Sequence, residues 1–155
     1  MLYSPEIPQN TGNISRTCAV TGAVLHIIKP IGFEISDRTL KRAGLDYWDK
    51  LEIYYYENYE EFESKHRGSP MYYFSSKGKR CYAEVDYPEE CFLVFGRETA
   101  GLPEELLRKN LENTLRLPML GDRRCLNLSN AVAIATYEVL RQGGFEGFVT
   151  EGALS

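Results

Sequence analysis

The feature that most constrains this chain is an alternation of short apolar runs with amphipathic segments that stop near glycines. The apolar runs are rich in β-branched or aromatic residues and predict strands at 24–28, 51–55, 71–74 and 91–95. The other segments carry plausible capping residues and predict helices at 11–21, 36–43, 58–66 and 103–108. Alternating strands and helices favour a mostly parallel sheet with helices on both faces, so the expected fold class is α/β.

Length and composition bound the number of domains. The 155 residues, 43% hydrophobic and 26% charged, leave room for one core, and we expect a single domain over residues 1–155. No linker, repeat or low-complexity segment divides the chain, and the glycine-rich tail at 143–155 is expected to be irregular.

Charge and cysteine usage argue against several classes of protein. With a formal charge of -4, the chain lacks the overall positive charge of proteins that coat nucleic acids without sequence preference. Any RNA or DNA binding must therefore use local positive patches. Without a signal segment or an apolar run of about 20 residues, we expect a cytoplasmic protein with no membrane contact. Dispersed cysteines without a C-x-x-C pair predict neither a metal site nor a disulfide framework; they are Cys18, Cys81, Cys91 and Cys125.

The last predicted helix begins at Asn127 or Ser129, ends at Gly143 and is apolar on two sides. One side is the stripe Leu128, Ala131, Val132, Ala135 and Val139, and the other holds Ile134 and Tyr137. A helix of this kind must be covered twice. The sheet covers one side; the other is covered by the same helix of a second subunit, which predicts a two-fold homodimer, or by the interior of a monomer.

Motifs of the common nucleotide-binding and hydrolytic sites are absent from the sequence. There is no G-x-G-x-x-G after a strand, no G-x-x-x-x-G-K-[ST], no G-x-S-x-G and no H-E-x-x-H. An α/β domain without them needs a site built from the loops that follow its strands.

A first polar cluster, residues 5–16, leads from a turn-rich segment into a helix. Asn10 and Thr11 are natural N-caps, and Arg16 is expected about one turn inside the helix. The cluster is either a capped helix with a surface arginine or a site for an anion or hydroxyl, where backbone N–H groups and Arg16 converge.

A second cluster, residues 95–103, runs from a strand end into a helix. Gly96 and Gly101 allow the backbone to approach a ligand or to adopt a positive φ, and Glu98 places an acid at the mouth of the strand. A plain strand-to-helix loop explains the glycines equally well, so Glu98 is the stronger indication of a site.

A third cluster, residues 115–130, carries Arg123 and Arg124 in a polar loop before the last helix. Asn127, Ser129 and Asn130 place three hydrogen-bonding side chains in four positions. One helix cap uses fewer than that, so the excess indicates a polar site.

Motifs within these clusters resemble those of the SPOUT (SpoU-type) RNA 2′-O-ribose methyltransferases. They are N-T-G-N-I-x-R near the start, F-G-R-E-T-A-G-L-P in the middle, and R-L-P-M followed by L-N-L-S-N-A near the end. The opening P-E-I-P-Q-N-T-G-N and the segment R-A-G-L-D-Y at 42–47 are similar to the branch that methylates the wobble nucleotide of tRNA, cytidine or uridine 34. The resemblance covers nearly the whole chain. It implies a deep C-terminal trefoil knot, S-adenosylmethionine bound in the knot and released as S-adenosylhomocysteine, an obligate homodimer, and the tRNA anticodon loop as partner.

The resemblance also assigns individual residues. Those expected to bind S-adenosylmethionine are Phe74, Ser75, Gly96, Glu98, Thr99, Ala100, Gly101, Leu117, Met119, Cys125, Leu126 and Ser129. Those expected to be catalytic or to position the substrate are Asn10, Arg16, Glu98, Asn127 and Asn130, with Tyr137 as a further candidate. Two features depart from the family: Cys125 stands where relatives often carry serine, and the first strand, 2–4, is short, which concerns the edge of the sheet rather than the site.

In the methyl transfer implied by the resemblance, the difficult step is activation of the nucleophile, the ribose 2′-hydroxyl. A ribose 2′-hydroxyl is a weak acid, so it must be held opposite the methyl group while the developing alkoxide is stabilised. A guanidinium keeps its proton at neutral pH, so we expect Arg16 to stabilise charge and grip a phosphate. A phosphate oxygen or water then takes the proton.

RNA contacts must come from the domain itself. Candidate phosphate contacts are Lys77, Lys79, Arg80, Arg123, Arg124, Arg38, Lys41 and Arg42, although solvated loops also explain each run and are favoured for 38–42. Candidate base-stacking residues, for which places in the strand core and rim are favoured, are Tyr54, Tyr55, Tyr56, Tyr72 and Tyr73. We expect His26 and His66 to be structural.

Two alternatives to wobble methylation stay open at this point. The same chemistry could act on another tRNA or rRNA nucleotide, because the three motifs do not select the substrate. A non-catalytic knotted dimer that binds RNA is the other alternative, and the intact set Asn10, Arg16, Glu98 and Asn127 argues against it.

Overall fold

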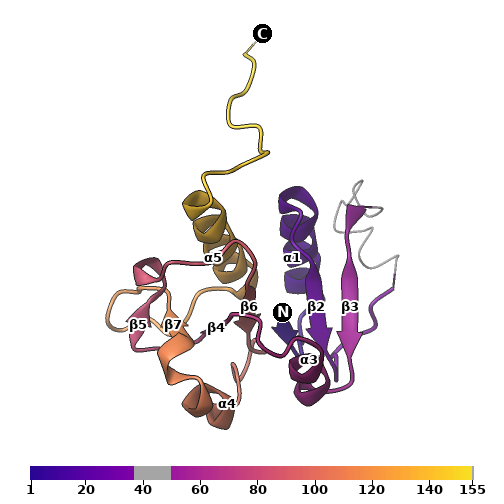
Figure 1. The fold of residues 1–155 in the computed structure, drawn as a ribbon. Coiled ribbons are helices and arrows are strands. Elements are labelled where there is room, and N and C mark those ends of the chain that lie inside the picture. Colours follow the sequence, from indigo (N-terminus) through magenta and orange to yellow (C-terminus); the bar gives the residue numbers. More distant parts are fainter. Residues whose placement is uncertain (37–49, 155) are drawn as a thin grey trace.

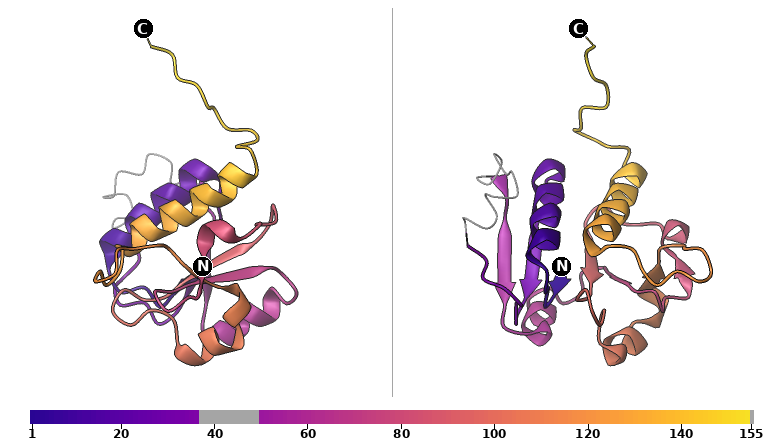
Figure 2. Two further views of the ribbon diagram at one scale, coloured as in Figure 1. Left: turned by 90° about the vertical axis from the view of Figure 1, so that its left-hand side faces the viewer. Right: turned by 180° about the vertical axis from the view of Figure 1, so that it is seen from behind.

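The computed structural model describes residues 1–36 and 50–154, and it shows one sheet between two layers of helices (Figures 1 and 2). All strand pairs are parallel, in the order β3-β2-β1-β6-β4-β7-β5. The predicted α/β class is confirmed. The strands are β1 (Leu2–Tyr3), β2 (Leu25–Ile28), β3 (Ile53–Tyr56), β4 (Met71–Phe74), β5 (Arg80–Cys81), β6 (Phe92–Phe95) and β7 (Thr114–Arg116).

The helices divide between the two faces of the sheet. Helices α1 (Pro8–Thr21) and α5 (Leu128–Gln142) lie side by side on one face, and α3 (Tyr59–Lys65) and α4 (Glu104–Lys109) cover the other (Figure 2). Two short 3-10 helices, η2 (Tyr82–Glu84) and η3 (Leu111–Asn113), precede β6 and β7. No helix within residues 1–36 and 50–154 is long and apolar enough to cross a bilayer.

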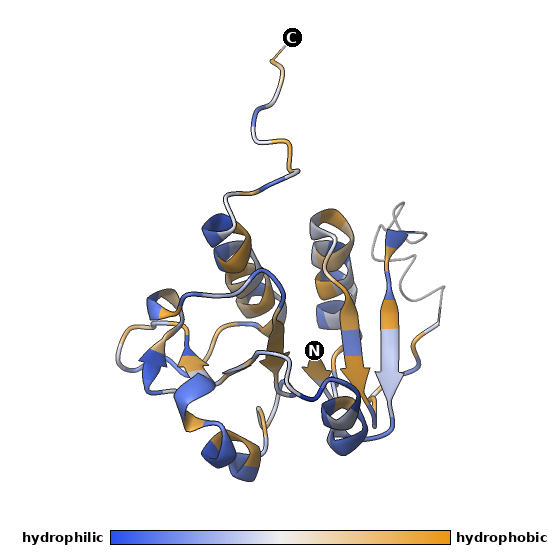
Figure 3. Ribbon diagram, in the orientation of Figure 1, coloured by the Kyte–Doolittle hydropathy of each residue, from blue (hydrophilic) through white to orange (hydrophobic). Residues whose placement is uncertain are grey.

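Each face of the sheet has its own apolar core. Successive strand residues point to opposite faces, so Ile27 packs in the core under α1 and α5, whereas Ile28 packs in the core over α3 and α4. Val132 of α5 belongs to the first core and Phe62 of α3 to the second. Strand β6, in the centre of the sheet, is correspondingly apolar along its whole length (Figure 3).

Most predicted boundaries agree with the structure to within two residues. The strands at 24–28, 51–55, 71–74 and 91–95 are confirmed as β2, β3, β4 and β6. Asn58 caps α3 through its side chain, and α5 follows Asn127 and stops before Gly143. The expected helix at 36–43 extends into residues 37–49, outside the described part of the chain, together with Arg38, Lys41, Arg42 and the segment 42–47.

The predicted start of the first helix was wrong. Helix α1 begins at Pro8, with Ile7 as N-cap and no side-chain cap. Proline suits this position because its φ is already helical and it has no N–H to satisfy. Asn10 and Thr11 are therefore inside the helix and do not cap it, and Arg16 lies about two turns from the helix start rather than one.

The place of the first strand also differs from the expectation. Strand β1 has only two residues, yet it lies in the middle of the sheet, between β2 and β6, and not at an edge. Leu2 is fully buried there. A short strand is sufficient because both neighbours supply parallel partners for it.

Helix α5 leaves its second apolar side uncovered in this chain. Val132 and Ala135 are buried against the sheet, whereas Ile134 is 40% and Tyr137 is 45% exposed. The alternative of a helix buried on all sides inside a monomer is wrong.

The two histidines form a hydrogen-bonded group with one tyrosine. His26 Nδ1 lies 2.8 Å from the hydroxyl oxygen of Tyr56, which lies 2.9 Å from Nε2 of His66. Phe62 and Phe92 pack against both imidazole rings. Burial, helped by nearby positive charge, lowers the pKa of His26 to about 4. A structural role, as expected, agrees with this packing.

This histidine predicts a stability that depends on pH. In the unfolded chain His26 binds a proton near pH 6.5, whereas the folded chain keeps it neutral down to about pH 4. The free energy of unfolding should therefore fall by about 3 kcal/mol as the pH is lowered through this window. In urea titrations at pH 7, 5.5 and 4.5, His26→Phe should show a shallower decline, and a decline equal to that of the unsubstituted protein would contradict the assignment.

Candidate functional site

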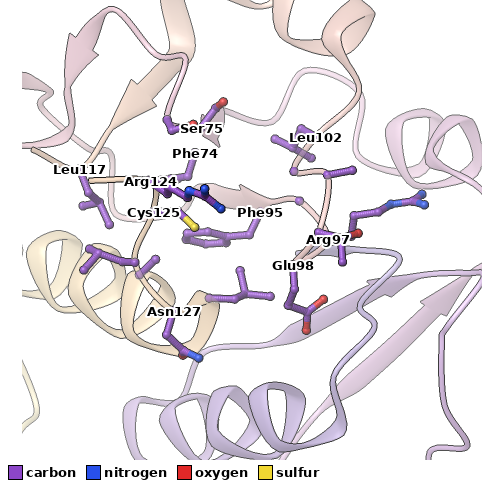
Figure 4. Close-up of a pocket in the computed structure, with 18 of the residues that line it drawn as sticks. Phe74, Ser75, Phe95, Arg97, Glu98, Leu102, Leu117, Arg124, Cys125 and Asn127 are labelled. Atoms are coloured by element: carbon purple, nitrogen blue, oxygen red, sulfur yellow. The ribbon is translucent and has the colours of Figure 1, made fainter. Parts of the chain in front are cut away.

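The loops at the carboxyl ends of the central strands surround a cavity of about 440 Å³ (Figure 4). Its walls come from residues 74–77 after β4, 95–102 after β6 and 117–128 after β7, with Ile7 and Asn10 from the start of α1. Carboxyl ends of parallel strands are the usual place for a ligand in open α/β sheets. All three clusters singled out in the sequence meet here.

The structure brings together most of the residues expected to hold S-adenosylmethionine. The cavity is lined by Phe74, Ser75, Gly96, Glu98, Thr99, Ala100, Gly101, Leu117, Met119, Cys125 and Leu126. Ser129 is the exception, because it is buried beside the start of α5 and its hydroxyl donates to Oδ1 of Asn127 at 2.6 Å.

The expected catalytic residues divide into two groups. Asn10, Glu98 and Asn127 line the cavity. Arg16, Asn130 and Tyr137 are exposed on α1 and α5 and are not among its lining residues. A single chain therefore assembles only part of the expected catalytic set.

The inner wall of the cavity is flat and apolar. The rings of Phe74 and Phe95, at the ends of neighbouring strands, stack with centroids 4.8 Å apart and 17° between their planes. Leu117 and Met119 come from the loop after β7. A planar aromatic group fits against such a wall, while the polar groups at the rim can orient it.

Glycines shape the cavity because the backbones cross too closely for side chains. A Cβ on Gly96 would lie 2.0 Å from the carbonyl carbon of Gly101. Gly101 has φ of +68°, and its N–H closes the loop by donating to the Arg97 carbonyl at 2.9 Å. The second wall of the cavity is thus a tight loop that returns on itself.

Glu98 fastens this loop to the start of α1. Its carboxylate accepts hydrogen bonds from the N–H of Glu6 at 2.8 Å, the N–H of Ile7 at 3.0 Å and the side-chain amide of Asn10 at 3.3 Å. Glu98 thus binds the N–H of the N-cap residue Ile7 and of the residue before it, and its negative charge suits the positive end of the helix dipole.

Asn127 continues the hydrogen-bonded chain into the third motif. Its Nδ2 donates to Oδ1 of Asn10 at 3.0 Å. Its Oδ1 caps α5 by accepting from the backbone N–H of Ser129 at 3.0 Å and of Asn130 at 3.4 Å. Glu98, Asn10 and Asn127 therefore join three segments that are far apart in the sequence.

The sequence analysis assigned no role to several residues that line the cavity. It also assigned none to Glu6, which contacts the lining residue Thr99. The carboxylate of Glu6 accepts the N–H of Thr99 at 3.1 Å and its hydroxyl at 2.9 Å. These residues are 93 positions apart, so no local pattern could pair them. The other cavity residues not assigned to the site are Ile7, Ser76, Phe95, Arg97, Leu102, Leu107, Leu128 and Ala131.

Positive side chains lie around the rim. Lys77 and Arg124, two of the expected phosphate contacts, line the cavity. Lys77 pairs with Glu104 of α4, and Arg116 donates to the Ser76 carbonyl. Arg80 belongs to β5 and donates to the Glu84 carbonyl at 3.2 Å, which the sequence analysis did not foresee.

Cysteines and metal-binding groups contribute little to this site. Cys18 is buried and Cys91 is half-buried, and burial raises the pKa of each thiol to about 11, so both stay protonated at neutral pH. All four cysteines are free, and Cys125 lies at the cavity. In residues 1–36 and 50–154, no group of three or more His, Cys, Asp or Glu side chains is placed to hold a metal ion.

Comparison with known proteins gives a consistent result. The sequence model of the SpoU rRNA Methylase family matches residues 1–137. A Listeria monocytogenes serotype 4b (strain F2365) protein with the provisional name tRNA (cytidine(34)-2'-O)-methyltransferase is 52% identical over 154 residues, which cover 97% of this chain and 91% of that protein.

Solved structures share the fold over nearly the whole chain. One, described as giving structural insights into the 2-OH methylation of C/U34 on tRNA, has a TM-score of 0.87 and 44% identity and covers 94% of this chain and 95% of its own. An AdoMet-bound rRNA methyltransferase from Sinorhizobium meliloti has a TM-score of 0.79 and 29% identity over 90% of this chain and 54% of its own.

The crossing at Gly96 predicts a strong and local mutational effect. Gly96→Ala should lower the free energy of unfolding by about 3 kcal/mol, because its methyl group meets backbone that cannot move aside. Gly121→Ala is the matched control, since nothing lies within 4 Å of its added Cβ. Urea unfolding of both variants measures the difference, and equal stability would contradict the close crossing.

Proposed function

The chain belongs to the SpoU rRNA methylase family, and we propose that it transfers the methyl group of S-adenosylmethionine to the ribose 2′-hydroxyl of tRNA nucleotide 34, the wobble cytidine or uridine. The observation that carries this proposal is the hydrogen-bonded set Asn10, Glu98 and Asn127 at the edge of one apolar cavity. The name of the Listeria relative, which matches over almost the entire chain, supports tRNA nucleotide 34 as the substrate rather than another RNA position.

The cavity fits S-adenosylmethionine. A volume of about 440 Å³ lies in the ordinary range for small-molecule sites. The stacked rings of Phe74 and Phe95, together with Leu117 opposite the loop at 96–101, form a wall that suits the adenine ring. Because Gly96 has no side chain, the backbone of Gly101 can pass close to it and shape this loop. When bound, S-adenosylmethionine supplies a methyl group on a positively charged sulfur that leaves as a neutral thioether.

The polar residues at the cavity have separable tasks. Both oxygens of Glu98 already accept hydrogen bonds, so we assign Glu98 to holding the loop and the start of α1 together rather than to accepting a proton. Asn10 and Asn127 are oriented by each other and place amide groups at the rim, where they can position the ribose. We assign proton removal to a phosphate oxygen or to water.

Arg16 then acts from a second subunit. It is exposed on α1 of this chain, as are Asn130 and Tyr137 on α5, and all three lie outside the lining of their own cavity. Exposed apolar side chains gather on the same helices and the turn after α1: Val20, Val24, Ile134 and Tyr137. A two-fold dimer through α1 and α5 would cover this apolar surface and bring Arg16 to the partner's cavity, where it can stabilise the developing alkoxide.

The tRNA anticodon loop would lie across the rim and the dimer surface. Lys77 and Arg124 at the cavity are the nearest candidates for phosphate contacts, with Lys79, Arg80 and Arg123 beside them. Of the tyrosines, Tyr54 is exposed and can stack on a base, whereas Tyr56 and Tyr73 are buried and structural. A tRNA substrate agrees with a cytoplasmic location.

We also propose that the chain forms a trefoil knot around the cavity. Strand β7 enters the sheet between β4 and β5, which precede it in the sequence. The loop at 75–79 passes so close to β7 that a Cβ on Gly78 would lie 2.5 Å from the carbonyl carbon of Leu115. Residues 117–127 then return across the sheet to α5, which packs beside α1. This crossing and return support a threaded path.

The central experiment is transfer of labelled methyl from S-adenosylmethionine to unmodified and cellular tRNA, with the labelled nucleotide mapped. Label is expected on the ribose of nucleotide 34. Arg16→Ala should lower turnover by about 100-fold, because the developing alkoxide loses its cation. Arg67→Ala, an exposed arginine after α3, is the matched control and should stay within about twofold. Label at another nucleotide would overturn the substrate, and no label on any RNA would favour a binding protein.

Subunit mixing tests whether Arg16 acts in the partner's cavity. Arg16→Ala and Asn10→Ala proteins, each inactive alone, should regain about a quarter of the activity when unfolded and refolded together, because half of the dimers then carry one intact site. Adding Ile134→Asp to both should abolish the recovery by placing a charge in the interface. Leu111→Asp is the control, since Leu111 is 56% exposed on η3, away from α1 and α5. No recovery in the mixed protein would show that Arg16 acts within its own chain.

A further inference from the structure

We propose that Glu6 is a positioning residue that fixes the cavity wall at 97–101 by holding Thr99, and that it thereby sets the affinity for S-adenosylmethionine. The inference rests on the function proposed above. It concerns a residue that lies outside the lining of the cavity and to which the sequence analysis assigned no role, although it belongs to the opening P-E-I-P-Q-N-T-G-N.

The first and second motifs are joined by two carboxylates, one from each motif, and each carboxylate accepts hydrogen bonds from the other motif. Glu6 accepts from the hydroxyl of Thr99, at 3.0 Å to Oε1 and 2.9 Å to Oε2, and from its N–H at 3.1 Å. In the opposite direction, Glu98 accepts the N–H of Glu6 at 2.8 Å. Each segment thus provides a carboxylate that accepts backbone N–H groups of the other: Glu6 accepts that of Thr99, and Glu98 accepts those of Glu6 and Ile7. Hydrogen bonds to ionised groups are stronger than those between neutral groups.

The segment after β2 holds the backbone at Glu6 in place. Gly32 donates its N–H to the Pro5 carbonyl at 3.0 Å, and a Cβ added to Gly32 would lie 3.1 Å from Cα of Glu6. Ser4 holds a left-handed φ of 47° and donates its N–H to the Ile28 carbonyl at 2.9 Å. Glu6 is therefore a rigid attachment point between the end of β1 and the segment that follows β2.

The wall that Glu6 holds is an exposed part of the cavity. Thr99, Ala100 and Gly101 all line the cavity and are all exposed to solvent. Glu98 anchors the loop on one side of its tip, and the hydrogen bond from Gly101 to Arg97 closes its base. The contact with Glu6 fixes the tip itself. Without it, a ligand would have to order this wall on binding, which weakens affinity.

Removing this contact should weaken cofactor binding and leave the stability of the fold nearly unchanged. Glu6→Ala should weaken binding of S-adenosylhomocysteine by about tenfold, because it removes the acceptor of both the hydroxyl and the N–H of Thr99. Thr99→Val should weaken binding by a smaller factor, about threefold, because it removes the hydroxyl bond and leaves the backbone N–H bond to Glu6. The two changes together should cost no more than Glu6→Ala alone, since that change already removes the hydroxyl bond. The KM for S-adenosylmethionine should rise, while the affinity for tRNA and the midpoint of thermal unfolding change little.

The test is calorimetric titration of the full chain with S-adenosylhomocysteine, with hydrogen exchange of the amides at 97–101 measured on the same samples without ligand. Thr99→Ser keeps the hydroxyl and should recover most of the affinity lost in Thr99→Val. Glu57→Ala is the matched control, because Glu57 pairs with Lys29 on an exposed surface and does not line the cavity. Faster exchange at 99–101 in Glu6→Ala, together with the tenfold weaker binding, supports the inference.

Two results would overturn the inference in distinguishable ways. Binding by Glu6→Ala as tight as in the unsubstituted protein, with unchanged exchange at 99–101, would overturn the role of Glu6 and leave the proposed function intact. Failure of the unsubstituted protein itself to bind S-adenosylhomocysteine would overturn the proposed function and the role of Glu6 with it.

Discussion

The hydrogen bonds from the start of α1 to the carboxylate of Glu98 are the interaction on which the rest of the site depends. A helix leaves its first N–H groups without partners, and Ile7 cannot cap this one. The N–H of Ile7 itself is bound by a residue 91 positions away, Glu98 in the loop after β6. The same hydrogen bonds therefore fix the start of α1 and the wall of the cavity, and Asn10 and Asn127 extend them to the third motif.

The parallel sheet explains why these segments meet at all. Because every strand runs in the same direction, the loops after β1, β4, β6 and β7 emerge at one edge. Strand β1 is short but central, so the segment that leads into α1 emerges directly beside the loop of β6. The apolar wall of the cavity continues the core, since Phe74 and Phe95 belong to both. The inner wall of the cavity is thus formed by core residues, and its rim is formed by the polar loops.

How much could be read from the sequence depended on whether the signal was local. The cap at Asn127, the strand at 71–74 and the positive φ of Gly101 follow from short patterns, and the structure bears them out. Asn10 was misread as a cap because Pro8 starts the helix earlier and leaves Asn10 facing Glu98 and Asn127. Strand β5 has two residues, too few for a periodic pattern. The pairing of Glu6 with Thr99 depends on tertiary folding alone.

The division of the expected catalytic residues has a physical reason as well. Asn10 and Arg16 lie on one helix six residues apart, and this spacing turns them to different sides of it. One side meets the cavity of the same chain, and the other faces outward beside exposed apolar side chains. A sequence motif records both residues without recording that they face different sides of the helix.

The most direct test of the central claim, that the three motifs form one binding site at the carboxyl ends of the strands, is an NMR titration of the isotope-labelled protein with S-adenosylhomocysteine. The account predicts that the amides of residues 75–77, 96–101 and 117–127 shift together with a single dissociation constant. Shifts confined to the opposite end of the sheet, around Cys18, His26 and Cys91, would contradict it.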